Sequence, residues 1–380
     1  MSTERIRIPV RSRGPALALV LTVVGMLALA ARAEALPAKF WGVVPQSTLT
    51  EAENERLARG GAESVRIPFE WAELQPRRNS PIEWAEIDRV IERANRAGLD
   101  VLPTVAGAPT WAVHQRRVPG GRGAMAPARL PTRGAAAGAW RRLLRLAVLR
   151  YGPRGSFWKE HPELRKRPIR FWQIGNEPNF KYFVARPNAA EYGKLVMQSY
   201  ASIHRTDRGA RIVLAGLFGE PAGCRREKRP LSPCADDFLD RMYRTTPGLK
   251  KRFVGVALHP YSRWWQHLRP QIESVRAVLA KRRDAGKGLW VTELGWSSKP
   301  PEPNRNAFAK GVNGQRNQLR GAFRLLKRMQ RKWRVRRAYW FSVNDLEGSC
   351  NFCDGSGLFA DGFKPKKSWY AYVNLAGGKR

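Results

Sequence analysis

The 380-residue sequence lacks the glycine-rich loops that bind nucleotides, because it contains neither a GxGxxG nor a GxxxxGK[ST] pattern. It has no internal repeat and, beyond residue 31, no apolar run long enough to span a bilayer. Acidic residues are scarce, with 31 Asp and Glu against 69 Lys and Arg. These absences argue against a nucleotide-loop fold, a repeat protein and a multi-span membrane protein. The 14 Trp and 15 Phe argue against disorder, since they provide ample surface to bury.

The N-terminus is typical of an export signal. Arginines precede an apolar run at residues 15–31, and Ala31-Arg32-Ala33 fits a small-x-small cleavage site. We therefore predict a signal peptide at 1–33 and a secreted or extracytoplasmic protein. The alternative is an uncleaved membrane anchor, which is less favoured because the run is short for a spanning helix. Membrane contact is expected only in that form.

The net charge of +38 has two interpretations. One is affinity for a polyanion, such as an acidic polysaccharide or an anionic cell surface. The other is simply a solvated basic surface. A nucleic-acid partner is not expected, because the exported chain shows no basic recognition helix or nucleic-acid motif.

The only four cysteines form two close pairs, Cys224 with Cys234 and Cys350 with Cys353. An even number in an exported chain indicates disulfides, although four cysteines allow three connectivities. Local pairing is the simplest of these. A redox or zinc site at the second pair is disfavoured, because no helix pattern follows it and the other pair has the wrong spacing.

Eight short apolar runs alternate with segments of helical periodicity, which predicts a single-domain (β/α)8 TIM barrel over residues 34–380. An open doubly wound sheet is the alternative, and the missing glycine loop disfavours it. Residues 106–134 are expected to form a loop over the top face. The expected strands are Phe40–Val44, Val65–Phe69, Leu99–Val105, Ile169–Ile174, Ile212–Phe218, Phe253–Leu258, Leu289–Leu294 and Ala338–Val343. The expected helices include Glu83–Ala97, Ala135–Tyr151, Ala189–Thr206, Asp236–Thr245, Pro270–Ala285 and Gly314–Lys332.

Two glutamates follow or end predicted strands at the barrel's C-terminal face, where such barrels carry their chemistry. Glu177 follows the fourth strand in IGNEP, and Glu293 ends the seventh in VTELGW. Strands three places apart in a ring of eight face each other across part of the mouth. Paired carboxylates, one protonated and one ionised, are what glycosidic bond cleavage requires.

These two motifs resemble the signatures of clan A glycoside hydrolases, the retaining (β/α)8 glycosidases. The resemblance covers nearly the whole barrel and is strongest to family 39 exopolysaccharide hydrolases, more loosely to family 5. It implies Glu177 as acid/base and Glu293 as nucleophile, with a carbohydrate substrate. It also implies substrate-pocket roles for five residues: Asn176 on the sugar 2-hydroxyl, Arg66 and Tyr261 as donors to Glu293, His259 lining the sugar site, and Trp340 as the sugar platform.

We therefore expect a monomeric retaining glycosidase that acts on an extracellular poly- or oligosaccharide. No cofactor or metal is expected, because no ligand cluster of His, Cys or Asp is apparent in the sequence. The alternative is a non-catalytic barrel of the cell envelope that binds polysaccharide. Retention of both glutamates with Arg66 argues against that alternative, since a binding protein does not need an acid/base.

Overall fold

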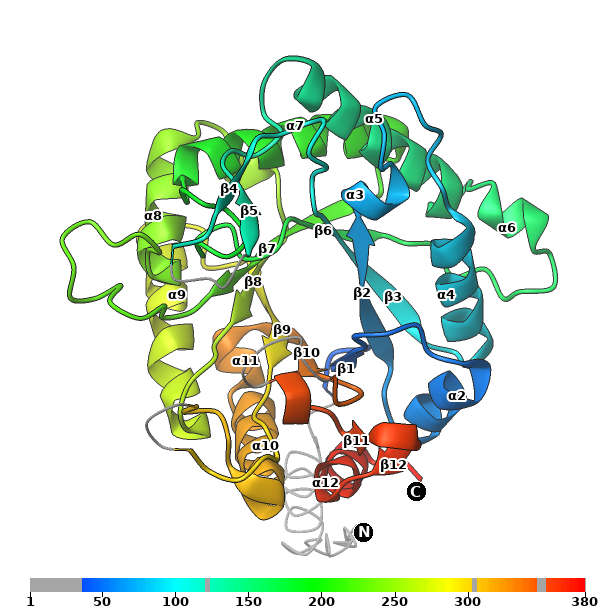
Figure 1. Ribbon diagram of the computed structural model, residues 1–380, viewed down its shortest axis with the longest axis vertical. Coiled ribbons are helices and arrows are strands. Elements are labelled where there is room, and N and C mark those ends of the chain that lie inside the picture. The colour runs from blue at the N-terminus through cyan, green and yellow to red at the C-terminus, as the bar shows by residue number, and fades with distance from the viewer. Residues whose placement is uncertain (1–35, 120–123, 303–305, 347–352, 380) are drawn as a thin grey trace, which may run out of the picture. The chain divides into compact units, whose positions relative to one another are not determined.

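In the computed structural model, eight parallel strands close into a barrel in the order β1-β10-β9-β8-β7-β6-β3-β2 (Figure 1). The structure describes residues 36–119, 124–302, 306–346 and 353–379. Each of the eight predicted runs contributes one strand, which confirms the expected fold. The strands are β1 (Trp41–Val44), β2 (Ser64–Glu70), β3 (Asp100–Ala106), β6 (Phe171–Ile174), β7 (Arg211–Phe218), β8 (Gly255–His259), β9 (Gly288–Leu294) and β10 (Val335–Phe341).

Helices surround the barrel and cover its strands. All seven residues of β9 are buried, for example, and strands covered on both sides read as continuous apolar runs. The α-helices are α2 (Glu51–Arg59), α3 (Trp71–Leu74), α4 (Ala85–Arg96), α5 (Gly134–Tyr151), α6 (Phe157–Glu160), α7 (Ala189–Thr206), α8 (Ala235–Thr245), α9 (Leu268–Lys281), α10 (Gly311–Arg328), α11 (Gln330–Trp333) and α12 (Lys367–Ala376). Short 3₁₀ turns are η1 (Leu249–Lys251), η2 (Trp265–His267), η3 (Cys353–Gly355) and η4 (Asp361–Phe363).

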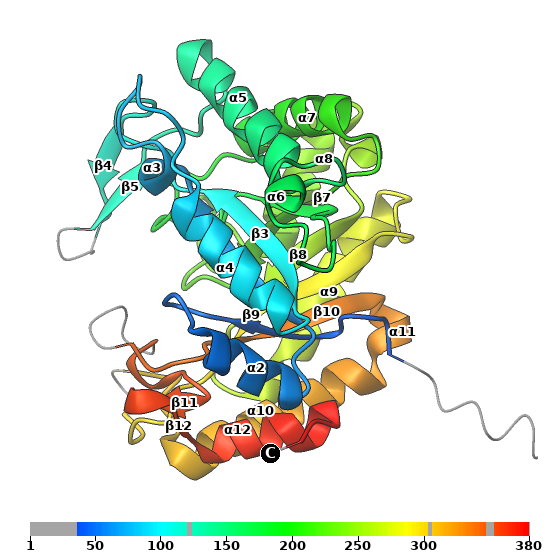
Figure 2. The same ribbon diagram turned by 90° about the vertical axis from the view of Figure 1, so that its right-hand side faces the viewer.

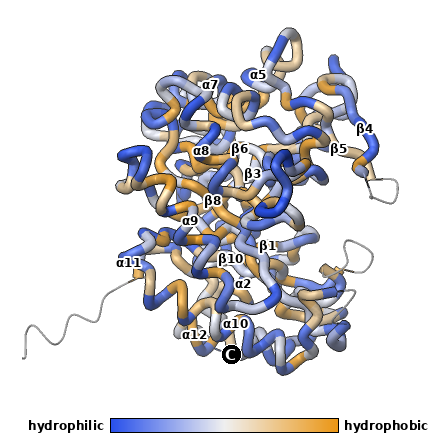
Figure 3. The backbone as a smooth tube through the Cα atoms, turned by 90° about the vertical axis from the view of Figure 1, so that its left-hand side faces the viewer, coloured by the Kyte–Doolittle hydropathy of each residue, from blue (hydrophilic) through white to orange (hydrophobic). Residues whose placement is uncertain are grey.

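Local sequence explains how these helices begin and which face they bury. On α4, Ile87, Ile91 and Ala94 are buried at the spacing of one helix face. Helix α9 begins two residues before Pro270, which lies in the first turn, where a missing N–H costs nothing. The predicted helix at 314–332 is divided between α10 and α11. In Figure 3 the hydrophobic colour lies along β8 and its neighbours, where the core is.

The excursion between β3 and α5 contains regular structure that the sequence did not predict. Strands β4 (Gln115–Arg117) and β5 (Met125–Pro127) pair as an antiparallel hairpin. A second small pair joins β11 (Phe359–Ala360) to β12 (Lys364–Pro365). Both pairs protrude at the same face of the barrel (Figure 2). Strands of two or three residues carry too little periodicity to be detected from sequence.

The predicted signal segment, residues 1–33, lies outside the described residues. Residues 37–380 form one compact unit. Among the described residues, every helix is too short or too polar to cross a bilayer.

Candidate active site

Glu177 and Glu293 reach the same end of the barrel from β6 and β9, which lie three places apart in the ring of strands. Glu293 lies in β9, one residue before the strand ends. Glu177 follows β6 in a turn where Gly175 has φ 81° and Glu177 itself has φ 40°. A left-handed backbone is uncommon for a residue other than glycine, and such strain clusters at functional sites. The N–H of Glu177 donates to the carbonyl of Gly216 in β7 at 3.1 Å, which holds the turn in place.

The two carboxyl groups meet at His259, the last residue of β8. Its Nδ1 lies 2.6 Å from Oε1 of Glu177 and 3.5 Å from Oε2 of Glu293. One carboxylate oxygen of each glutamate and one nitrogen of this histidine all lie within 4.8 Å of one another. Glu177 is 4% exposed and Glu293 is 8% exposed, so both carboxyl groups are largely shielded from solvent.

Arg66, in β2, connects the two motifs. Its Nη1 donates to Oε1 of Glu293 at 2.6 Å, and its Nη2 donates to Oδ1 of Asn176 at 2.6 Å. Its Nε donates to the side-chain carbonyl of Gln173 at 2.9 Å. Arg66 is 5% exposed, and its three guanidinium nitrogens hold the carboxylate of Glu293 and the amides of Asn176 and Gln173.

Tyr261 supplies the second donor to Glu293. Its hydroxyl donates to Oε2 at 2.9 Å, so both oxygens of this carboxylate accept a hydrogen bond. The ring of Tyr261 stacks on Phe218 at 5.8 Å and lies edge-on to Phe341 at 6.4 Å. These aromatic contacts set the direction of the hydroxyl.

The environments of the two carboxyl groups differ. Burial raises the pKa of Glu177 well above its usual range, the charge of Glu293 adds to this, and Arg66 only partly opposes it. Burial also raises the pKa of Glu293, but there Arg66 and the Tyr261 hydroxyl both donate to the carboxylate and stabilise its ionised form. The arrangement therefore favours a proton on Glu177 and a charge on Glu293.

His259 is a neutral member of this group. Burial lowers its pKa well below the usual range, and the nearby charge of Arg66 lowers it further. Its Nε2 lies 3.0 Å from the hydroxyl of Thr292, which also accepts from Nε2 of Gln173 at 3.4 Å. A buried chain of hydrogen bonds thus runs from Arg66 through these residues to Glu177.

Sequence reasoning missed Gln173 and Thr292. Both have no exposed surface, and both lie inside runs whose apolar residues by themselves predict only a strand. A buried amide or hydroxyl is costly without a partner, so a polar residue inside such a run was the available signal.

The expected platform residue, Trp340, is not part of this group. Its side chain has no exposed surface, and its indole nitrogen donates to the carbonyl of Ser356 at 3.0 Å. Its ring packs near Trp296 at 6.1 Å instead. The next residue, Phe341, is the one that contacts Tyr261. Successive residues of a strand point to opposite faces, so Trp340 points away from the face that Phe341 presents to Tyr261.

A further carboxyl group, which the sequence did not single out, lies at the end of β2. Burial raises the pKa of Glu70 to about 7, the charge of Glu73 adds to this, and Arg66 opposes it. The carboxyl group packs against Gly107, where a Cβ would lie 1.6 Å from its Oε2. A side chain at position 107 would overlap the Glu70 carboxyl group, and glycine avoids that overlap.

Glu177, His259 and Glu293 are close enough to act as metal ligands. However, both oxygens of Glu293 already accept hydrogen bonds, one of them from a guanidinium. A cation there would lie beside the positive charge of Arg66, so this set fits proton transfer better than metal binding.

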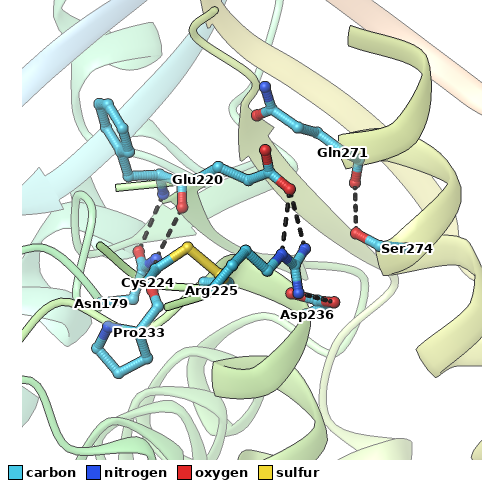
Figure 4. The surroundings of a disulfide bond; sticks show 10 residues. Asn179, Glu220, Cys224, Arg225, Pro233, Asp236, Gln271 and Ser274 are labelled. Carbon is cyan, nitrogen blue, oxygen red and sulfur yellow. Dashed lines mark hydrogen bonds and ion pairs between the residues drawn. A yellow bond between two sulfur atoms is a disulfide. The ribbon is translucent and has the colours of Figure 1, made fainter. Parts of the chain in front are cut away.

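A disulfide closes the loop that follows β7 (Figure 4). It joins Cys224 to Cys234, which confirms the first predicted pair, whereas Cys350 of the second pair lies outside the described residues. Asn179 connects this loop to the turn of Glu177: its Nδ2 donates to the carbonyls of Phe218 and Pro233 at 2.8 and 2.9 Å. The disulfide loop thus supports the turn that presents the carboxyl group.

No protein-family model and no curated protein matches the sequence. Solved structures do match. A family 39 glycoside hydrolase from Bacteroides cellulosilyticus WH2 is 16% identical, with a TM-score of 0.59 over 90% of this chain and 64% of that one. A GH5_18 structure from Bifidobacterium longum subsp. infantis is 16% identical, with a TM-score of 0.62 over 91% of this chain and 80% of that one.

The intracellular xylanase TsXylA from Thermoanaerobacterium saccharolyticum is 15% identical, with a TM-score of 0.56 over 90% of this chain and 97% of that one. The chain spans just under two thirds of the family 39 structure. At these identities the likeness concerns the fold: this chain has the (β/α)8 barrel found in clan A glycoside hydrolases.

Proposed function

We propose that this protein is a retaining glycosidase in which Glu293 is the nucleophile and Glu177 is the acid/base. The observation that carries the proposal is the unequal environment of two adjacent carboxyl groups. Glu293 accepts from Arg66 and Tyr261, whereas the side chain of Glu177 lies against the neutral His259. Carboxyl groups with divergent environments are the basis for dividing acid and nucleophile roles.

The reaction would take two steps. In the first, a carboxylate oxygen of Glu293 bonds to the anomeric carbon while Glu177 gives its proton to the departing glycosidic oxygen. Glu293 loses its charge in the covalent ester, so the pKa of Glu177 falls, because that charge raises it in the free enzyme. In the second step Glu177 takes a proton from water, which attacks the anomeric carbon and releases Glu293.

Oxygens of the two glutamates lie within 4.8 Å, which supports retention of configuration. Retaining enzymes separate their carboxyl groups by about 5–5.5 Å, whereas inverting enzymes need about 6.5–9.5 Å to admit a water molecule. Arg66 holds the side chain of Asn176, and we propose that Asn176 binds the 2-hydroxyl of the sugar. We propose an extracellular poly- or oligosaccharide as the substrate.

The test is hydrolysis of an aryl β-glycoside panel, with the first-formed anomer identified by NMR. We expect the retained anomer from the unaltered protein and no turnover from Glu293→Gln, which keeps the shape but cannot act as a nucleophile. The inverted anomer would reject the mechanism. Absence of turnover in both proteins, together with polysaccharide binding, would instead identify a non-catalytic binding barrel.

A further inference from the structure

Three contiguous hollows lie beside the β4–β5 hairpin, and together we call them the basic groove. Their volumes are about 820, 350 and 440 Å³. Arg133 lines all three, Ala112 and Ala136 join the first to the second, and Arg116 and Arg129 join the second to the third. Each hollow falls within the size range of saccharide- or drug-sized ligand pockets.

The basic groove is strongly cationic. Its exposed cations are Arg78, Arg116, Arg129, Arg133, Arg142, Arg186 and Lys194. None of the seven forms an ion pair with an acidic residue in the described part of the chain, whereas Arg150 elsewhere pairs with both Asp88 and Glu160. Glu191 is the one acidic side chain among the described lining residues. Unpaired cations concentrated in a concave surface attract anionic ligands.

An aromatic residue lies at the end of the basic groove nearest to β2. Trp111 is half-buried, and its indole nitrogen donates to the carbonyl of Gln75 at 2.9 Å. Its ring lies edge-on to Trp71 at 5.3 Å, and Trp71 directly follows Glu70, the last residue of β2. A fixed indole can contact a sugar ring while the neighbouring arginines bind the acidic group of that sugar.

The basic groove lies at the same end of the barrel as the carboxyl pair. It is built from the segments that follow β2, β3 and β6, and β3 pairs directly with β6, which precedes Glu177. The N–H of Ala185, in the segment after Glu177, donates to the carbonyl of Pro127 in β5 at 2.8 Å. Figure 2 shows the hairpin and α3 at one face of the barrel. A polymer in the groove would therefore approach the carboxyl pair.

We propose that the basic groove binds an anionic polysaccharide, one bearing carboxylate or sulfate groups, and directs it to Glu177 and Glu293. The claim that the bound polymer is also the substrate rests on the proposed function. The binding itself does not, since it depends only on the groove.

The experiment compares two triple variants that lose the same charge. Arg116→Gln/Arg133→Gln/Arg186→Gln changes the groove. Arg316→Gln/Arg320→Gln/Arg324→Gln changes a second basic hollow of about 450 Å³ between α10 and α12, on the outside of the barrel. Each triple is placed in the Glu293→Gln background so that polymers are not cleaved. Binding is measured for polygalacturonate against its methyl ester and for dextran sulfate against dextran, at low and high salt.

We expect at least one polyanion to bind more tightly than its neutral counterpart, and salt to weaken that binding. The groove triple should bind it about tenfold or more weakly, and the control triple within about twofold of the unaltered protein. Equal losses in the two triples, or no preference for either polyanion, would overturn the proposal. So would equally tight binding of poly(dT) that is lost in the groove triple, because the groove would then be a nucleic-acid site.

Activity measurements test the role of the basic groove separately from the proposed glycosidase function. With Glu293 restored, both triples should hydrolyse a small neutral aryl glycoside at the unaltered rate, and the groove triple should show a raised KM for the polyanion with kcat unchanged. If the unaltered protein hydrolyses no glycoside, the proposed function is wrong. The binding comparison would still show whether the basic groove binds a polyanion. A groove triple that has lost the aryl glycosidase reaction would count against a separate binding role.

Discussion

Arg66 and Glu293 form a buried ion pair across the barrel, with Nη1 of the arginine 2.6 Å from Oε1 of the glutamate. The pair joins β2 to β9, which are not neighbours in the sheet. Breaking a buried pair by removing one partner is costly, because the remaining charge is left uncompensated.

Arg66→Gln should raise the pKa of Glu293. Arg66→Lys keeps the positive charge, so it should raise that pKa by a smaller amount. Glu293 must be ionised to attack, so the acidic limb of the kcat/KM profile should move to higher pH. The basic limb should also move up, because Arg66 lowers the pKa of Glu177 as well. Loss of this donor should reduce kcat about 10²–10³-fold at neutral pH. A pH–rate profile whose acidic and basic limbs stay at the same pH in Arg66→Gln would contradict this assignment.

Glu177→Ala and Glu293→Ala should behave differently on an activated aryl glycoside. Without Glu293 no covalent ester forms, so turnover should stop. Without Glu177 the good leaving group still departs, and the glycosyl-enzyme should accumulate and appear by mass spectrometry. Azide needs no general base, so it should restore turnover in Glu177→Ala. Equal inactivity of both variants, with no azide effect, would mean that the roles are assigned incorrectly.

Glu70 should make stability depend on pH. Its pKa of about 7 in the folded chain exceeds the ordinary value of 4.5, so the folded chain holds the extra proton between these values. This contribution to the free energy of unfolding is fully present below pH 4.5 and is lost as the pH rises through about 7. Because the side chain is partly exposed, we expect a loss of about 1–2 kcal/mol.

Urea unfolding at pH 4.5 and pH 8 tests this prediction. Glu70→Gln should lose less stability over that interval than the unaltered protein. Glu55→Gln, which removes an exposed glutamate from α2, is the matched control and should leave the pH dependence unchanged. The same pH dependence in all three proteins would show that Glu70 ionises as it does in the unfolded chain.

Removing the disulfide should destabilise the protein with little effect on chemistry at low temperature. Cys224→Ser/Cys234→Ser frees a loop with a sequence separation of 10, which costs about 2–3 kcal/mol in the chain-entropy model. Asn179 still bonds to Pro233 in the loop and to Phe218, so aryl glycosidase activity should stay within a few-fold. The checks are denaturant unfolding and rate measurements under oxidising conditions. An unchanged unfolding midpoint would refute the stabilising role.

The sequence by itself located the strands and the two glutamates. Each strand is a local apolar run, and β9 is buried along its whole length, so no distant information was needed to find it. The sequence also predicts that Glu177 and Glu293 meet, because they lie at the ends of the fourth and seventh runs and the barrel brings the C-terminal ends of its strands together. Cys224 and Cys234 were also predictable, since their short separation makes a local pair the simplest closure.

Only the tertiary structure decided which side chains enter the group around the glutamates. The run Tyr339-Trp340-Phe341 places three aromatic residues in succession, so its composition cannot show which of them point inward. A shift of one residue exchanges the two faces, and the barrel register turns Trp340 away and Phe341 toward Tyr261.

The hydrogen-bond partners were likewise beyond the sequence. Gln173 and Thr292 lie 119 residues apart and become neighbours only when β6 and β9 are placed across the same barrel. The basic groove depends in the same way on the packing of the β4–β5 hairpin against the segment after Glu177, whose backbone contact joins residues 127 and 185. Local pattern determines strands and their ends, whereas contacts between distant segments depend on register and side-chain direction, which packing alone sets.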